Sequence, residues 1–194
     1  MTSPVAEELI ALARRDQSMR DELLAAGVLH DGNHPQMEAV HRENARRLET
    51  IILATGWPTE ARVGADAAQA AWLIAQHAIG LPEFQRACLR HLSEAARCGL
   101  VPLWQPAMLE DRIRMFEGRP QIYGTQLEPD DDGNLRAYLI EDPAGVDDRR
   151  RAVGLDSLAQ RLARAEPATL PKDRAQYERD YQEWLYRVGW RVRR

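Results

Sequence analysis

The chain has 194 residues, of which 44% are hydrophobic and 29% are charged, and its formal net charge is −4 at pH 7. These proportions are ordinary for a globular protein and exclude a disordered chain or a fibrous repeat. The net negative charge gives no reason to expect nucleic acid, and the basic residues between 187 and 194 are typical of a solvated terminus. No apolar run approaches the ~18 residues that a membrane-spanning helix needs, so we also expect no membrane partner.

Two features favour a cytoplasmic location. The first eight residues, Met1–Glu8, lack the basic and apolar regions of a secretory signal. Cys88 and Cys98 fall on one expected helix, too far apart along it to form a disulfide. Two unpaired thiols suit a reducing compartment, so we expect a cytoplasmic protein.

Helical periodicity, capping residues and glycine or proline stops predict helix after helix up to about residue 118. In chain order the expected helices span 4–15, 17–26, 35–55, 67–78, 82–98 and 104–117. Two β-like runs, 121–127 and 135–140, flank an acidic turn and predict one small hairpin. Closing helices are expected at 144–152, 155–165 and 172–187. The sequence therefore predicts a mainly α fold, a single-domain helical bundle over 1–194 with one β-hairpin at about 120–140.

Several polar residues fall on the apolar faces of these helices when residues are placed at about 100° intervals. On the helix 35–55, His41 and Asn44 lie within the apolar arc. On the helix 82–98, Gln85 and His91 do so. The helix 67–78 is apolar nearly all round, which is typical of a buried central helix, and its exceptions include Gln76 and His77.

Arg112 is a further inward residue, placed between Met108 and Phe116 on the apolar face of the helix 104–117. A buried guanidinium is costly unless it is paired, so its partner must be a carboxylate or an anionic ligand. Asp142 or Asp147 could supply that carboxylate. Each inward residue alone is typical of a satisfied core side chain, but their convergence from four helices predicts a polar pocket.

Three segments of the chain add a resemblance. They are the run Ala71–His77, the pair Asp111-Arg112 followed by Gly118–Gln126, and Ile140–Asp142 followed by 146–155. Together they resemble a family of uncharacterised bacterial proteins of similar length, marked by a Trp-Leu-x-x-Gln-His helix and a Gln-x-Tyr-Gly-Thr-Gln segment. The resemblance covers about residues 55–160 and implies no established activity. The candidate site residues that it places within the family's motifs are Gln76, His77, Asp111, Arg112, Gln121, Tyr123 and Gln126.

The leading hypothesis is a small-molecule enzyme that performs acid–base or hydrolytic chemistry on a small anionic or amide-bearing substrate. His77 would act as general acid or base, and Tyr123 could donate a proton or polarise an oxygen. Arg112, with Arg149 or Arg150, would bind a carboxylate or phosphate, which centres the pocket on His77 and Arg112.

The remaining candidates complete this pocket. Asp111 joins the catalytic candidates through the resemblance. Amide side chains offer paired donors and acceptors for a ligand amide or a nucleobase edge. The further ligand-binding candidates are Gln76, Gln121, Gln126, His41, Asn44, Gln85 and His91. An alternative for Tyr123–Gln126 is a strand whose glycine lets another backbone approach closely.

We expect no cofactor, and one alternative is a divalent metal held by His41, His77 and His91 from three helices. No His-x-x-x-His or Glu-x-x-His spacing supports that metal site. The acidic run 130–134 lacks the ligand spacing of a calcium loop and is typical of a solvated turn. A Cys88–His91 nucleophilic pair is a weaker alternative, because small buried cysteines are commonly inert.

The competing class is a non-catalytic interaction protein, such as an adaptor or an immunity-type partner, that uses aromatic surface anchors. Its candidate anchors are Trp57, Trp104, Trp184, Trp190, Tyr177, Tyr181 and Tyr186. On the last helix, however, Tyr177, Tyr181 and Trp184 follow a spacing that is more typical of docking onto the protein's own core. The sequence indicates no oligomeric state.

Overall fold

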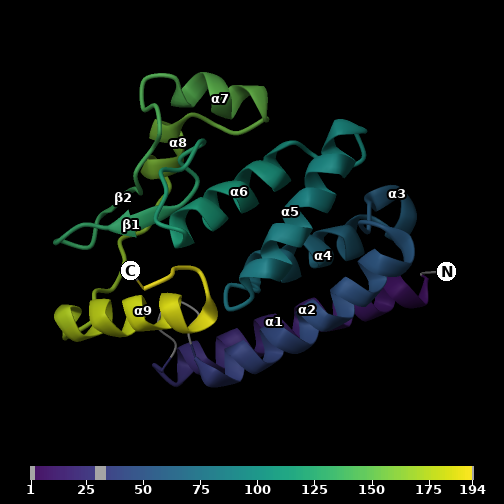
Figure 1. The fold of residues 1–194 in the computed structure, drawn as a ribbon, viewed down its shortest axis with the longest axis horizontal. Helices are drawn as coiled ribbons and strands as arrows, with labels where there is room; N and C mark the ends of the chain where they lie inside the picture. The colour runs from purple at the N-terminus through teal and green to yellow at the C-terminus, as the bar shows by residue number, and fades with distance from the viewer. Residues whose placement is uncertain (1–2, 29–33, 194) are drawn as a thin grey trace. The chain divides into compact units, whose positions relative to one another are not determined.

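The computed structural model describes residues 3–28 and 34–193, and within them the chain is mainly helical with one two-stranded antiparallel hairpin (Figure 1). The expected fold class is therefore confirmed. The chain divides into two compact units, Met1–Val101 and Pro102–Arg194, which are described separately below. The expectation of a single domain over 1–194 stays a prediction.

The first unit consists of helices alone in its described part. These are α1 (Pro4–Ala25), α2 (Pro35–Thr55), α3 (Glu60–Val63), α4 (Ala65–His77) and α5 (Pro82–Arg97). The helices α1, α2 and α5 begin with a proline, whose fixed φ and missing N–H suit the first helical turn. One continuous α1 replaces the two short helices that the sequence predicted on either side of Asp16.

The core of the first unit forms where α1 packs against both α2 and α4 (Figure 1). The buried face of α4 is rich in alanine, and Ala67, Ala71 and Ala75 are fully buried. Such small side chains let helices approach closely, so polar groups on facing positions are brought within contact distance. On α2, Met37 and Leu48 are buried together with His41 and Asn44, as the sequence predicted.

The second unit combines helices with the hairpin. Its elements are α6 (Trp104–Phe116), β1 (Leu127–Pro129), β2 (Leu135–Ala137), α7 (Val146–Ala152), α8 (Leu158–Ala163) and α9 (Arg174–Val188). The hairpin pairs Glu128 with Arg136 and is shorter than expected. Most of the first β-like run is a loop instead, tied at its start by an isolated parallel bridge between Gln121 and Ile140.

Aromatic side chains form part of the core of the second unit. The ring of Phe116 lies 5.7 Å from that of Trp184 and 5.1 Å from that of Trp190, measured between centroids. Both tryptophans are buried, as is Trp57 in the first unit. The expectation of exposed anchors is therefore wrong for these three residues: Trp184 of α9 and Trp190 pack on Phe116, and Trp57 is buried in the first unit.

Across the described residues, each helix is too short or too polar to span a bilayer.

Candidate functional site

Asp16 is the central residue of the candidate site, and it lies on the apolar face of α1. It follows Leu9 and precedes Leu23 by seven residues each, a spacing that keeps all three on one side of the helix. Leu9 is fully buried, Leu23 is 5% exposed and Asp16 is only 1% exposed. A carboxylate in such a place requires partners, because desolvating an unpaired charge is very costly.

Two histidines from other helices supply those partners. His77, the last residue of α4, places Nδ1 at 2.6 Å from Asp16 Oδ1. His41, from the middle of α2, places Nε2 at 3.3 Å from Asp16 Oδ2. The two imidazole rings lie 5.9 Å apart between centroids. Three helices that pack together thus bring one carboxylate and two imidazoles into a single cluster, Asp16–His41–His77.

The electrostatics of the cluster favour an ionised carboxylate. Burial alone would raise the pKa of Asp16, but hydrogen bonds and charge interactions with His41 and His77 outweigh it and hold that pKa well below its usual range. An ionised carboxylate can only accept, so the proton of the short contact lies on His77 Nδ1. His41 and Asp16 are nearly inaccessible, whereas the side chain of His77 is 23% exposed.

The cluster can therefore support two kinds of chemistry. The carboxylate fixes the ring of His77 through Nδ1, which leaves Nε2 for a substrate or a water molecule. The donor atoms of the three side chains also all lie within 4.8 Å of one another, and they are of the types that bind divalent metals.

Gln85 supports the end of α4 that carries His77. Its Nε2 donates to the carbonyl oxygens of Ala75 and Gln76, at 2.7 and 3.1 Å. The last carbonyls of a helix lack partners within the helix, so this fully buried amide satisfies two groups that would otherwise lose hydrogen bonds. Gln76 itself is buried. These bonds support a structural role for Gln85, and its predicted ligand-binding role stays a prediction.

Asn44 lies one helical turn beyond His41 on α2. Its Nδ2 donates to the carbonyl oxygen of Leu12 on α1, at 3.1 Å, which ties the two helices together. Its Oδ1 is buried and makes no hydrogen bond among the described residues. Asn44 therefore helps hold α1 beside α2, where Asp16 and His41 meet.

His91 does not join the site, and its predicted inward position is wrong. It is exposed on α5, whose buried face is centred on Gln85, Cys88 and Leu92. At about 100° per residue, His91 lies roughly a quarter turn from that face. Of the three histidines considered as metal ligands, His41 and His77 lie together, and Asp16 lies beside them in the place expected for His91. The Cys88–His91 pair loses its support for the same reason.

Asp111 of α6, predicted as catalytic, binds the backbone of its own unit. It is fully buried. Its Oδ1 accepts from the N–H groups of Ile122 and Tyr123, at 2.7 and 3.1 Å, and its Oδ2 accepts from that of Thr125 at 3.0 Å. Both oxygens are thus occupied in shaping the loop that follows α6, and this arrangement supports a structural role for Asp111.

The two glutamines of that loop, predicted to bind a ligand, are likewise occupied. Gln121 donates from Nε2 to the carbonyl oxygens of Gln126 and Tyr138, and its Oε1 accepts from the N–H of Gln126. Gln126 in turn donates from Nε2 to Thr125 Oγ1. These bonds close the loop on itself.

Gly124 lies in the same loop, which is not the strand that the sequence allowed for. Its φ of +64° is a conformation that favours glycine. Arg150, buried in α7, donates to the carbonyl oxygens of Gly124 and Tyr123. Arg149 donates to the carbonyl of Ile122 and pairs with Asp142 at 2.9 Å, so Asp142 is engaged there.

Arg112 and Tyr123, the other predicted site residues of the second unit, are both partly buried. Burial lowers the pKa of Arg112 to about 10, although Tyr181 acts in the opposite direction. Burial, followed by the nearby carboxylates of Glu110 and Asp111, raises the pKa of Tyr123. His77 belongs to the first unit and these residues to the second, so a pocket centred on both His77 and Arg112 stays a prediction.

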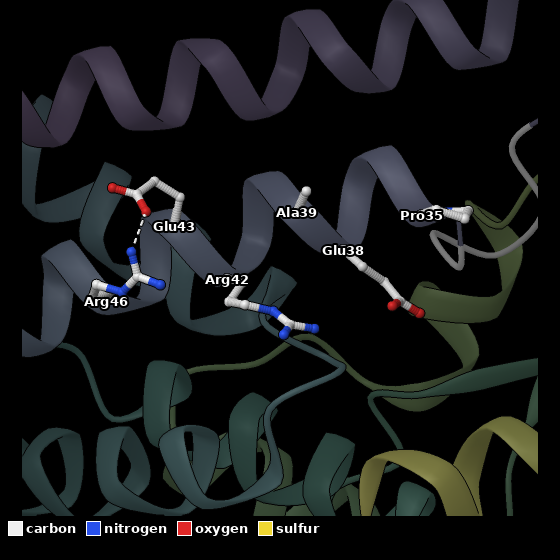
Figure 2. Close-up of a pocket in the computed structure, with 6 residues that line it drawn as sticks. All are labelled: Pro35, Glu38, Ala39, Arg42, Glu43 and Arg46. Carbon is white, nitrogen blue, oxygen red and sulfur yellow. Dashed lines mark hydrogen bonds and ion pairs between the residues drawn. The ribbon is translucent and has the colours of Figure 1, made fainter.

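A shallow hollow lies on the outer face of α2 and has no part in the cluster. Figure 2 shows its charged side chains projecting from one face of the helix, and Glu43 pairs with Arg46 at 2.8 Å. The residues that line it are Pro35, Glu38, Ala39, Arg42, Glu43 and Arg46. None of the predicted site residues is among them, and His41 lies on the opposite, buried face of the same helix.

The sequence reasoning missed Asp16, the residue that connects the two histidines. A signal was available: Leu9, Leu12, Asp16, Met19 and Leu23 follow the alternating three- and four-residue spacing of one helical face. Ending a helix at residue 15 broke that pattern and left Asp16 in a gap. A continuous helix would have shown an acidic residue within an apolar stripe.

The comparisons with known proteins bear on the family alone. The sequence profile of a family of unknown function (DUF6624) matches residues 4–170. This match confirms that the chain belongs to an uncharacterised family, and it extends beyond the segments from which the resemblance was drawn. No curated protein and no solved structure gives a significant match.

Proposed function

The chain belongs to the DUF6624 family, and we propose that it is an enzyme that carries out hydrolytic or acid–base chemistry on a small molecule at the cluster Asp16–His41–His77. We also place it in the cytoplasm, in keeping with its two free cysteines.

One observation carries this proposal: a fully buried carboxylate is held between two imidazoles that come from two other helices. Apolar residues of similar volume would serve a purely structural core at least as well, because burying charged groups is costly. Buried groups of this kind with perturbed ionisation are concentrated at functional sites. The cost of placing Asp16 in the core is therefore best explained by chemistry at that position.

The arrangement assigns different tasks to the three residues. Asp16 fixes the ring of His77, and His41 closes the other side of the carboxylate. His77 is the most exposed of the three, so it is the side chain through which the cluster reaches a substrate or a water molecule. A carboxylate that orients an imidazole in this way is a common element of general-base catalysis.

The substrate class expected from the sequence has weaker support than the reaction class. It rested on Arg112 and the glutamines of the second unit, and Gln121 and Gln126 bind groups of their own loop. The alternative of an interaction protein also loses support, because Trp57, Trp184 and Trp190 are buried. We therefore propose a reaction class without a named substrate.

The test is a panel of activated substrates that covers carboxylic esters, lactones, amides, phosphomonoesters and phosphodiesters. We expect the wild-type protein to hydrolyse at least one class, and His77→Ala and Asp16→Asn to lose about 100-fold or more of that rate. His91→Ala is the matched control, since His91 is an exposed histidine of the same unit. Absence of turnover in every class, or turnover by His77→Ala within about twofold of wild type, would overturn the proposal.

A further inference from the structure

We propose that Asp16, His41 and His77 form a binding site for one divalent transition-metal ion, with Asp16 oxygen, His41 Nε2 and His77 Nδ1 as the ligand atoms. The binding stands on the geometry of the cluster alone. The use of the ion in catalysis deepens the proposed function and rests on it.

The spacing of the donor atoms suits such an ion. In a tetrahedral site, ligand nitrogens and oxygens at about 2.1 Å from a zinc ion lie about 3.4 Å apart from one another. The contact between His41 and Asp16 measures 3.3 Å, that between His77 and Asp16 measures 2.6 Å, and all three donors lie within 4.8 Å of one another. The His77 contact would have to open by about 0.8 Å, and His77 Nδ1 would have to release its proton, for the ion to enter.

A second observation points to a cation at the same place. Asp16 Oδ2 and His41 Nε2 lie 3.3 Å apart in poor hydrogen-bond alignment, and neither atom has another hydrogen-bond partner among the described residues. Both side chains are more than nine-tenths buried. A buried polar atom without a hydrogen bond costs about 1–3 kcal/mol, and most such atoms in proteins find a partner. A metal ion between this oxygen and this nitrogen would satisfy both.

The ligand set also indicates the class of metal. Two imidazoles and one carboxylate suit zinc and the neighbouring first-row divalent ions, whereas magnesium and calcium prefer oxygen ligands. Three protein ligands leave at least one coordination position open, as in catalytic zinc sites. Since His77 is the most exposed of the ligands, the open position is expected on its side of the cluster.

The ion would supply the nucleophile of the proposed hydrolysis. A metal-bound water loses one proton to solvent at near-neutral pH, and the resulting hydroxide attacks the electrophilic carbon or phosphorus of the substrate. The bond to the leaving group then breaks, and the leaving group takes up one proton from solvent. No oxidation or reduction occurs, so the step requires no further reactant.

The binding test is calorimetry with zinc on the full chain, produced without a histidine tag and first treated with a chelator. We expect one ion per chain with a dissociation constant below about 1 μM, and about 100-fold weaker binding by His77→Ala, His41→Gln and Asp16→Asn. Cobalt bound to the wild-type protein should give visible absorption bands that these variants lack. Circular dichroism checks that each variant is folded, and His91→Ala should bind as the wild type does.

Two results would overturn the metal site: no zinc binding tighter than about 100 μM, or binding that the folded variant His77→Ala retains. The two proposals fail separately. If the chelated protein hydrolyses a substrate at the full rate and His77→Ala does not, the proposed function stands and the use of the ion in catalysis fails, while the binding site is judged by calorimetry alone. If zinc binds with the expected dependence on the three ligands and no substrate is hydrolysed, the metal site stands and the proposed function fails.

Discussion

The buried polar side chains of the two units have different partners. In the second unit, Asp111, Gln121 and Arg150 direct their hydrogen bonds mainly to backbone groups of one loop, residues 122–126, and its neighbours. In the first unit, Asp16, His41 and His77 contact one another. The sequence alone does not reveal this difference in partners.

This difference separates a structural use of buried polarity from a functional one. The loop after α6 has no regular ladder to satisfy its N–H and C=O groups, so buried side chains take the place of the ladder. The backbone N–H and C=O groups of the helices around Asp16 are already hydrogen-bonded within those helices. The cluster is therefore not needed to supply them with partners. Polar side chains that converge on one another from three helices are therefore the better indication of a site.

Replacing Asp111 gives the largest expected loss of stability. Asp111→Asn presents an amide NH₂ to N–H donors that need an acceptor, so we expect the free energy of unfolding in urea to fall by about 3 kcal/mol. Glu110→Gln on the same helix is the control, since it only weakens a surface pair with Arg114. A loss below about 1 kcal/mol for Asp111→Asn would remove the structural role assigned to this residue.

A glycine pair tests how closely the second-unit loop is packed. An added Cβ at Gly124 would lie 3.0 Å from Ile140 Cδ1 and 3.3 Å from Leu158 Cδ1, whereas at Gly154 it would meet nothing within 4 Å. Both residues have positive φ. Gly154→Ala should therefore cost about 1 kcal/mol for strain alone, and Gly124→Ala about 2 kcal/mol, in thermal or urea unfolding. Equal losses would contradict the packing of this loop.

Gln85 of the first unit combines a structural contact with an effect on the cluster. Gln85→Leu removes the amide that binds the last carbonyls of α4, so unfolding should require about 1–2 kcal/mol less. Because that turn carries His77, zinc affinity should fall about 10-fold in calorimetry. Gln69→Leu, at an exposed position of α4, is the matched control and should change neither quantity. Unchanged zinc binding by Gln85→Leu would show that Gln85 does not position His77.

The smallest expected loss of stability is that of Asp16→Asn, compared at pH 8 with the same substitution at Asp111. An asparagine can accept from His77 Nδ1 and donate to a neutral imidazole at His41, so the metal-free protein should lose about 1 kcal/mol or less. Zinc binding by this variant should nevertheless weaken about 100-fold. A loss of stability as large as that of Asp111→Asn would show that the cluster is structural as well.

The sequence predicted most of the helices and the inward positions of His41 and Asn44, because long amphipathic helices carry a clear period. The sequence could not show that His91 lies outside the core. Phe84 and Ala87 widen the apolar arc of α5 toward it, although both are only partly buried. The burial of Asp16 was missed because the polar run 14–18 looks like the end of a helix. The partners of Asp111 and Gln121 are backbone groups, which no side-chain pattern reveals.

The central claim, that the first-unit cluster binds an external group, is tested most directly by anomalous diffraction at the zinc absorption edge. Crystals grown from the tag-free protein with zinc should show a peak within about 2.1 Å of donor atoms from Asp16, His41 and His77. Zinc peaks elsewhere, with this cluster unoccupied and Asp16 still paired directly with His77, would contradict the claim.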